Sequence, residues 1–196
     1  VLFRSSPLGH QPMADPAGAA VIAFNGEIYN FLDLRRQLEA KGVAFRGHSD
    51  TEVLLHLYLD RGEAMLPALN GIFAFAIWDA RRKGLLVARD GLGVKPLYVA
   101  ETGRGVAFAS EIKALLQLLP EGRTIDVPAL RRYLSFLWCP GSGTPLKEVR
   151  KLPPGGLLWV ENGAVVRREQ WYRLPVVRGV VPSLSAAESV RQVAAG

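Results

Sequence analysis

The sequence has a single cysteine, Cys139, and only three histidines, His10, His48 and His56, at unrelated spacings. One thiol excludes a disulfide framework, and neither residue type is spaced as a zinc site requires. No apolar run approaches the roughly 18 residues of a membrane span. The start also lacks the charged and apolar regions of a signal peptide. We therefore expect a cytoplasmic protein with no metal site and no membrane partner.

Clustered charge is absent as well. The 24 Lys and Arg residues exceed the 18 Asp and Glu residues, but no basic run is longer than three residues. Basic residues alternate with acidic ones along the chain, whereas nucleic-acid sites gather them on one face. The sequence therefore predicts no nucleic-acid partner. With 196 residues, 49% of them hydrophobic, the chain is long enough for one domain with a sizeable core.

The apolar periodicity predicts short strands and helices in an α+β order. A strand over 19–24 precedes a helix that starts after Asn30 and ends at Gly42, and Ser49 starts a second helix. The pattern then predicts strands over 71–79, 85–88, 96–100, 105–109, 156–161 and 164–170, and helices over 113–118 and 127–136. This order is typical of an α+β fold with layered sheets.

Four residues near the first strand suggest a polar site. The Asn25 carboxamide and the Gly26 N–H, at the expected end of that strand, are fixed donors of the kind that an oxyanion hole needs. The carboxylates of Glu27 and Asp50 can hold an ammonium group. The alternative is a polar turn followed by helix caps, because Asn-Gly is common in turns and acids are favoured in a first helical turn. Spacing alone favours this alternative.

Further motifs follow in a fixed order along the chain. They are residues 9–13, 24–30, 49–52, 70–79, 88–90, 93–98, 109–115 and 151–155. Together they resemble the glutaminase domain of class II glutamine amidotransferases, and most of all that of the glutamine-hydrolysing asparagine synthases. The resemblance covers roughly residues 7–174, and several collinear motifs make it specific.

The resemblance implies an N-terminal nucleophile (Ntn) hydrolase fold, an αββα four-layer sandwich whose N-terminal strands are missing here. It also implies that an N-terminal cysteine, with its own α-amine as general base, hydrolyses glutamine to glutamate and ammonia. The ammonia passes to a synthetase domain that amidates aspartate with ATP. ATP and Mg²⁺ belong to that domain, which is absent here, so we expect no cofactor in this one. In the family pattern Asn25 and Gly26 match the oxyanion hole, and Glu27 and Asp50 match the residues that hold the α-amino group of glutamine.

The chain departs from the family at its start. It begins Val1-Leu2-Phe3-Arg4-Ser5, without the catalytic cysteine, and Arg4 does not match the arginine that the family uses for the substrate carboxylate. We expect 1–6 to be a non-matching segment, 7–174 the glutaminase domain and 175–196 a linker toward the absent synthetase domain. Cys139 has no free α-amine and is expected to be an inert thiol. We expect the chain alone to be inactive and, with sheet edges exposed, poorly soluble.

Two alternatives stay open. One is a catalytically dead scaffold that acts as a binding or structural module. The other is the glutaminase domain of a related amidotransferase with another acceptor. A Met-Cys-Gly start in the full open reading frame would favour the enzyme. The acceptor, the origin of residues 1–5 and the oligomeric state, with a homodimer among the candidates, are not fixed by the sequence.

Overall fold

The computed structural model describes residues 9–119 and 123–175. The strands are β1 (Met13–Ala14), β2 (Ala20–Ile28), β3 (Gly71–Asp79), β4 (Gly84–Arg89), β5 (Tyr98–Thr102), β6 (Gly105–Ala109), β7 (Val149–Lys151), β8 (Gly156–Glu161) and β9 (Ala164–Gln170). The helices are α1 (Phe31–Glu39), α2 (Asp50–Arg61), the 3₁₀ helix η2 (Gly62–Ala68), α3 (Ile112–Leu115) and α4 (Val127–Phe136).

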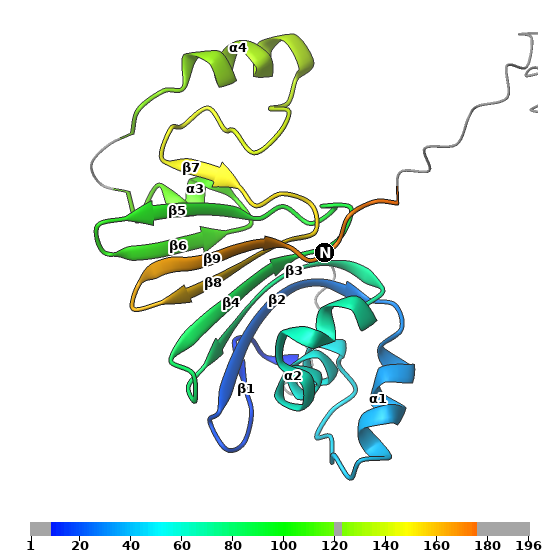
Figure 1. Ribbon diagram of the computed structural model, residues 1–196. Helices are drawn as coiled ribbons and strands as arrows, with labels where there is room; N and C mark the ends of the chain where they lie inside the picture. The colour runs from blue at the N-terminus through cyan, green and yellow to red at the C-terminus, as the bar shows by residue number, and fades with distance from the viewer. Residues whose placement is uncertain (1–8, 120–122, 176–196) are drawn as a thin grey trace, which may run out of the picture.

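These elements form four layers (Figure 1). Strands β1-β2-β3-β4-β8-β9 make a six-stranded sheet, and β6-β5-β7 make a three-stranded sheet that lies against it. All strand pairs are antiparallel. Helices α1 and α2 cover the outer face of the larger sheet, while α3 and α4 lie on the far side of the smaller one. This αββα sandwich confirms the predicted α+β, Ntn-hydrolase-like fold.

The alternation of side chains along β3 explains how one strand serves two layers. Phe73 and Phe75 point into the core beneath α1 and α2, and Ala74 and Ala76 point between the two sheets. Successive residues of a strand face opposite sides, so each face has its own composition. The bulky residues fill the space under the helices. The alanines let the sheets approach each other closely.

Several predicted elements are confirmed, and others differ from the prediction. The strand expected over 96–100 is Tyr98–Thr102, the helix expected over 113–118 is Ile112–Leu115, and the helix expected to end at Gly42 ends at Glu39. The strands over 71–79, 105–109, 156–161 and 164–170 and the helix over 127–136 have the expected bounds. The first strand, however, runs on to Ile28, because every residue from Ala20 to Ile28 pairs with β3. Asn25, Gly26 and Glu27 therefore lie inside a strand and not at a corner after it. The Asn30 side chain makes no cap bond to α1. It bridges Ala68 and Asn70 instead.

Hydrogen bonds at the start of α2 hold the loop before it. The Ser49 hydroxyl accepts a bond from the Glu52 N–H at 3.2 Å, as a cap should. The buried Glu52 carboxylate does not reach back to Ser49; it accepts bonds from the N–H groups of Arg46 and Gly47, each 2.8 Å long. The loop is thus tied to the helix, which fixes the position of Asp50 in its first turn.

Two residues of the 88–90 motif organise the turn that follows β4. The buried Asp90 carboxylate accepts hydrogen bonds from four backbone N–H groups, those of Phe73, Leu92, Val94 and Lys95. The Arg89 guanidinium donates to three carbonyl oxygens, those of Gly93, Lys95 and Leu152. These bonds join the turn to β3 and to the 151–155 motif. The motif residues are structural here.

Some sequence expectations fall outside the described residues. The non-matching segment 1–6 lies wholly there, and the linker 175–196 does so apart from Pro175. Across 9–119 and 123–175, none of the helices has both the length and the apolar character that a membrane crossing requires.

Candidate functional site

Gly26 lies where the backbones of β2 and β3 approach each other closely. It is opposite Phe73 in the strand register. A Cβ atom at Gly26 would lie 2.2 Å from the carbonyl oxygen of Ile72 and 2.7 Å from the Cα of Phe73. No real side chain tolerates such contacts, so only glycine fits.

The backbone of Phe73 shows which way the Gly26 N–H points. The Phe73 N–H donates to the Asp90 carboxylate at 3.2 Å, and its carbonyl oxygen accepts from the Asp90 N–H at 2.7 Å. Both groups of Phe73 are directed toward β4, so Phe73 and Gly26 form a pair without mutual hydrogen bonds. The Gly26 N–H therefore points away from β3, toward the other edge of β2.

The two neighbouring amides on that edge confirm this direction. The Phe24 N–H donates to the Gln11 side-chain oxygen at 2.6 Å, and the Ile28 N–H donates to the Asp50 carboxylate at 3.2 Å. Gly26 lies midway between Phe24 and Ile28, and alternate residues of a strand turn their N–H groups to the same side. The edge thus presents the Gly26 N–H between two amides that side chains already bind.

The side chains of Asn25 and Glu27 share the sheet face that looks toward the smaller sheet. Asn25 is half-buried and donates through Nδ2 to the hydroxyl of Ser110 at 3.1 Å. Ser110 directly follows β6, so this bond joins the two sheets. A carboxamide nitrogen has two N–H donors, and the bond to Ser110 uses one of them. The second remains for another acceptor.

Asp50 brings a second carboxylate to the end of β2, close to Glu27. Burial raises the pKa of Asp50, and the charge of Glu27 raises it further, while hydrogen bonds from the N–H groups of Ile28 and Thr51 oppose the rise. Among the described residues, none forms a salt bridge with Glu27 or Asp50. Two carboxylates whose charges interact, and neither of which is paired with a cation among the described residues, make a suitable site for an ammonium group.

The structure therefore places all four sequence-predicted residues, Asn25, Gly26, Glu27 and Asp50, around one end of β2. Sequence reasoning did not assign roles to Ser110, which accepts a bond from Asn25, or to Gln11, which binds the N–H of the neighbouring Phe24. Both lie in motifs of the family resemblance, at 109–115 and 9–13, and this is the signal that would have drawn attention to them.

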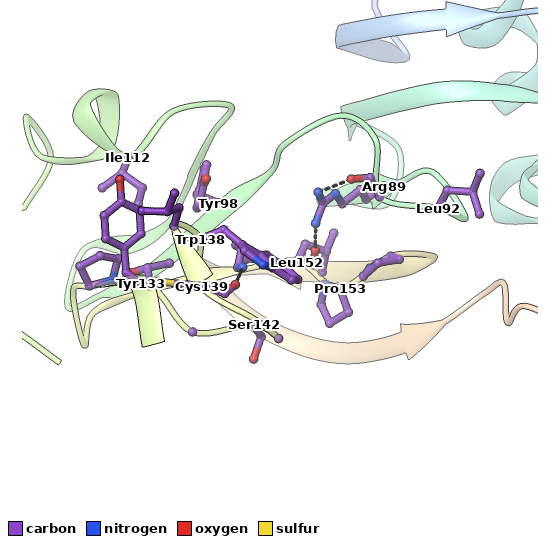
Figure 2. Close-up of a pocket in the computed structure, with 18 residues that line it drawn as sticks. Arg89, Leu92, Tyr98, Ile112, Tyr133, Trp138, Cys139, Ser142, Leu152 and Pro153 are labelled. Atoms are coloured by element: carbon purple, nitrogen blue, oxygen red, sulfur yellow. Dashed lines mark hydrogen bonds between the residues drawn. The ribbon is translucent and has the colours of Figure 1, made fainter. Parts of the chain in front are cut away.

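Cys139 has no part in this group. It follows α4, the helix on the far side of the smaller sheet (Figure 1), and it is buried, with its thiol donating to the Ala129 carbonyl at 3.6 Å. Asn25 lies on the larger sheet, on the inner face. A large cavity also opens near Cys139 (Figure 2), and none of the four candidate residues lines it.

The sequence of this chain is similar to those of asparagine synthetases. A family model described as "Glutamine amidotransferase domain" matches residues 2–172. Asparagine synthetase [glutamine-hydrolyzing] 3 of Bacillus subtilis is 51% identical over 166 residues, which are 82% of this chain and 27% of that protein. Its paralogue 1 is 44% identical over 147 residues, 75% of this chain and 23% of that protein. A putative asparagine synthetase of Mycobacterium tuberculosis is 39% identical over 187 residues, 91% of this chain and 28% of that protein.

Two solved structures share the fold. Glutamine phosphoribosylpyrophosphate amidotransferase of B. subtilis, in complex with ADP and GMP, has a TM-score of 0.59 at 24% identity and covers 84% of this chain and 32% of its own. A second structure, described as the allosteric regulatory enzyme of purine biosynthesis, has a TM-score of 0.60 at 26% identity, with coverage of 84% and 31%. The chain spans about a quarter of the length of its curated relatives. It belongs to the glutamine amidotransferase domain family and is homologous to the glutaminase domains of asparagine synthetases.

Proposed function

We propose that this domain hydrolyses the side-chain amide of glutamine within a longer protein, which uses the ammonia to amidate aspartate with ATP. The observation that carries the proposal is that the Asn25 carboxamide, the Gly26 N–H and two carboxylates lie at one end of β2, where the Asp50 carboxylate binds the Ile28 N–H and feels the charge of Glu27. The names of the asparagine synthetase relatives support aspartate as the acceptor.

Glutamine has the complementary set of groups. Its α-ammonium lies between Glu27 and Asp50, where charge-assisted hydrogen bonds hold it. Its side-chain carbonyl oxygen then points at the Gly26 N–H and the remaining N–H of Asn25. When a nucleophile attacks the carbonyl carbon, that oxygen becomes negatively charged, and the two fixed donors stabilise it more than they stabilise the neutral amide. The donors therefore lower the barrier to acyl transfer.

Ser110 acts in this scheme as a positioning residue. Its hydroxyl accepts one N–H of Asn25 and so sets the direction of the other. It comes from the smaller sheet, and so the packing of the two sheets fixes the orientation of the donor.

None of the residues discussed so far, Asn25, Gly26, Glu27, Asp50 and Ser110, is the nucleophile. The family resemblance implies an N-terminal cysteine, and the single cysteine of this chain, Cys139, is buried elsewhere and mid-chain. We propose that the full-length protein supplies the thiolate. Attack forms a carbon–sulfur bond, the carbon–nitrogen bond breaks, ammonia leaves with the transferred proton, and water then hydrolyses the thioester to glutamate.

The test is glutamine hydrolysis by the product of the full open reading frame, with glutamate and ammonia measured separately. Asn25→Asp replaces a donor with a negative charge at the oxyanion position. We expect kcat to fall about 10²- to 10³-fold with a smaller change in KM. Asn162→Asp, in the exposed turn between β8 and β9, is the control and should leave both constants unchanged. Unaltered kcat in Asn25→Asp would refute the assignment.

A further inference from the structure

Strand β1 pairs with β2 over only two residues, along the edge of β2 that faces away from β3. Met13 lies opposite Ile22, and β1 begins at this pair. Alternate pairs of an antiparallel ladder exchange hydrogen bonds, so the next bonded pair in the same register would be Gln11 opposite Phe24. The Gln11 carbonyl would then accept the Phe24 N–H. The chain bends at residues 11 and 12 instead, and its backbone leaves β2 there.

The Gln11 side chain takes the place of that backbone carbonyl. Its Oε1 accepts the Phe24 N–H at 2.6 Å. Phe24 is buried, and an N–H in such a position needs an acceptor. The side chain supplies the acceptor and lets the backbone turn away. The ladder between β1 and β2 therefore ends without leaving Phe24 unpaired.

The end of this ladder decides what the Gly26 N–H can bind. One bonded pair beyond Gln11 and Phe24, the same register would put Gly9 opposite Gly26. The Gly9 carbonyl would then accept the Gly26 N–H, as the alternation of bonded pairs requires. A donor that is already used by a neighbouring strand cannot bind a substrate oxygen. The bend at residues 11 and 12 removes this competitor.

The segment that carries Gln11 is itself firmly held. Met13 is buried in the core beneath α1 and α2. The Asp15 carboxylate accepts the Ala20 N–H at 2.6 Å, which closes the turn between β1 and β2. Gln11 thus reaches Phe24 from a fixed position, so its bond can fix the edge of β2 in turn.

The two side chains that bind amides on either side of Gly26 differ in charge. Asp50 binds the Ile28 N–H through a carboxylate, and Gln11 binds the Phe24 N–H through a neutral carboxamide. A strand rises about 3.3 Å per residue, so each of these amides lies about 7 Å from that of Gly26. In the proposed complex the ammonium group of glutamine offsets the charge of Asp50. A carboxylate at the Gln11 end would repel the charge that develops on the substrate oxygen, so a neutral acceptor suits this position.

We propose that Gln11 is a positioning residue of the oxyanion hole. Its side chain ends the pairing of β1 with β2 at Phe24 and so keeps the Gly26 N–H available to the substrate. Gln11 acts through β2 and does not touch glutamine. The proposal rests on the proposed function in taking the Gly26 N–H to be a donor to the amide oxygen of glutamine. Each oxyanion donor then has its own support, Ser110 for the Asn25 carboxamide and Gln11 for the Gly26 N–H.

The test is glutamine hydrolysis by the product of the full open reading frame and its Gln11 variants. Gln11→Met keeps the length of the side chain and removes the acceptor. Gln11→Glu keeps an acceptor oxygen and adds a negative charge. We expect kcat to fall at least about tenfold in both, with KM within about threefold of the wild-type value, because the donor acts mainly in the transition state. Gln11→Glu should also keep the melting temperature of the wild-type protein.

The matched controls are Gln37→Met and Gln37→Glu on α1, where Gln37 is exposed and accepts a bond from Arg61 at 3.0 Å. Both should leave kcat and KM unchanged. Amide hydrogen exchange on the same samples reports on the edge of β2 directly. In the wild-type protein we expect the Gly26 amide to exchange faster than that of Phe24. In Gln11→Met the Phe24 amide should exchange at least about tenfold faster than in the wild type.

Three results would overturn the proposal. The first is wild-type kcat in both Gln11 variants of a protein that hydrolyses glutamine, which would leave the proposed function intact. The second is full activity in Gln11→Glu together with a loss in Gln11→Met that matches its loss of folded protein, because the bond to Phe24 would then be structural only. The third is a Gly26 amide that exchanges as slowly as that of Phe24. Absence of hydrolysis in the wild-type protein and both controls would refute the proposed function, and this role with it.

Discussion

The carboxylate of Asp50 accepts a hydrogen bond, 3.2 Å long, from the backbone N–H of Ile28. This bond connects the first turn of α2 to the last residue of β2. It holds a carboxylate that burial and the charge of Glu27 make costly to ionise. A folded protein keeps such an arrangement at a cost in stability, which a ligand ammonium would relieve.

Replacing Asp50 should therefore stabilise the empty protein while weakening substrate binding. The folded-state pKa of Asp50 is raised above its ordinary value of 3.8, so ionisation of this group destabilises the fold as the pH rises through the folded pKa. Asp50→Asn removes that effect. We expect the variant to have the larger free energy of unfolding at pH 7, an advantage that disappears below pH 3.8. Urea denaturation across this range measures it.

The control is Asp33→Asn in the first turn of α1, where the carboxylate is exposed and paired with Arg36. It should show no such gain. If Asp50→Asn were less stable than the wild-type protein at neutral pH, the claim that the ionised Asp50 carboxylate destabilises the fold would be wrong. For glutamine hydrolysis by the full-length protein, Asp50→Asn should raise KM.

Ser110→Ala tests whether the smaller sheet orients the Asn25 donor. Without the hydroxyl, Asn25 loses the acceptor that fixes its carboxamide. We expect kcat for glutamine hydrolysis to fall about tenfold, with KM nearly unchanged, because the donor matters most in the transition state. Ser110→Thr keeps the hydroxyl and should restore much of the rate. Equal effects of the two substitutions on kcat would indicate a packing role only.

Asp90→Ala tests the structural role of the 88–90 motif. The substitution leaves four backbone N–H groups without their acceptor. We expect a loss of about 3 kcal/mol or more in the free energy of unfolding, since each unsatisfied buried donor costs about 1–3 kcal/mol. Asp90→Asn retains one acceptor oxygen and should lose less. Chemical denaturation that finds the two variants equally stable would contradict this account.

Leu137→Gly tests the strained end of α4, where Leu137 has a φ of 57°. Glycine removes about 1–2 kcal/mol of strain from the left-handed backbone of the folded protein. It also lowers the free energy of unfolding by about 0.5–1 kcal/mol, because the unfolded chain has more conformational freedom at a glycine. We expect the 1–196 chain to be unchanged or more stable by up to about 1.5 kcal/mol. Lys83→Gly, at a turn residue with a φ of 51°, is the matched control away from α4. Urea denaturation should show a change of the same sign in both variants, and a clear loss of stability in Leu137→Gly would contradict the presence of strain at this residue.

Local signals explain which elements could be predicted. The β8–β9 hairpin follows from Asn162-Gly163, which adopt φ values of 50° and 78° in the turn. Asp126 caps α4 through the Ala129 N–H, as its sequence position suggests. In both cases adjacent residues determine the conformation, so no knowledge of distant contacts is needed.

Distant contacts decided the elements that were not predicted. Asn25 and Glu27 are polar, and only their pairing with β3 keeps them in a strand. Strand β7, with three residues, exists through its pairing with β5. The four candidate site residues could be identified from sequence motifs. The bond between Asn25 and Ser110 could not, because it joins residues 85 positions apart. This hydrogen bond between the two sheets becomes visible only once their packing is known.

The most direct test of the glutamine site compares L-glutamine with glutaramate, the same amide without an α-amino group, in the full-length protein. The wild-type protein should have a kcat/KM at least about 10²-fold higher for L-glutamine, since two charge-assisted contacts are worth about 1.5–3 kcal/mol each. In Glu27→Gln/Asp50→Asn this preference should fall close to one, through loss of activity on L-glutamine alone. A preference that survives in the double variant would contradict the assignment of these carboxylates to the ammonium group.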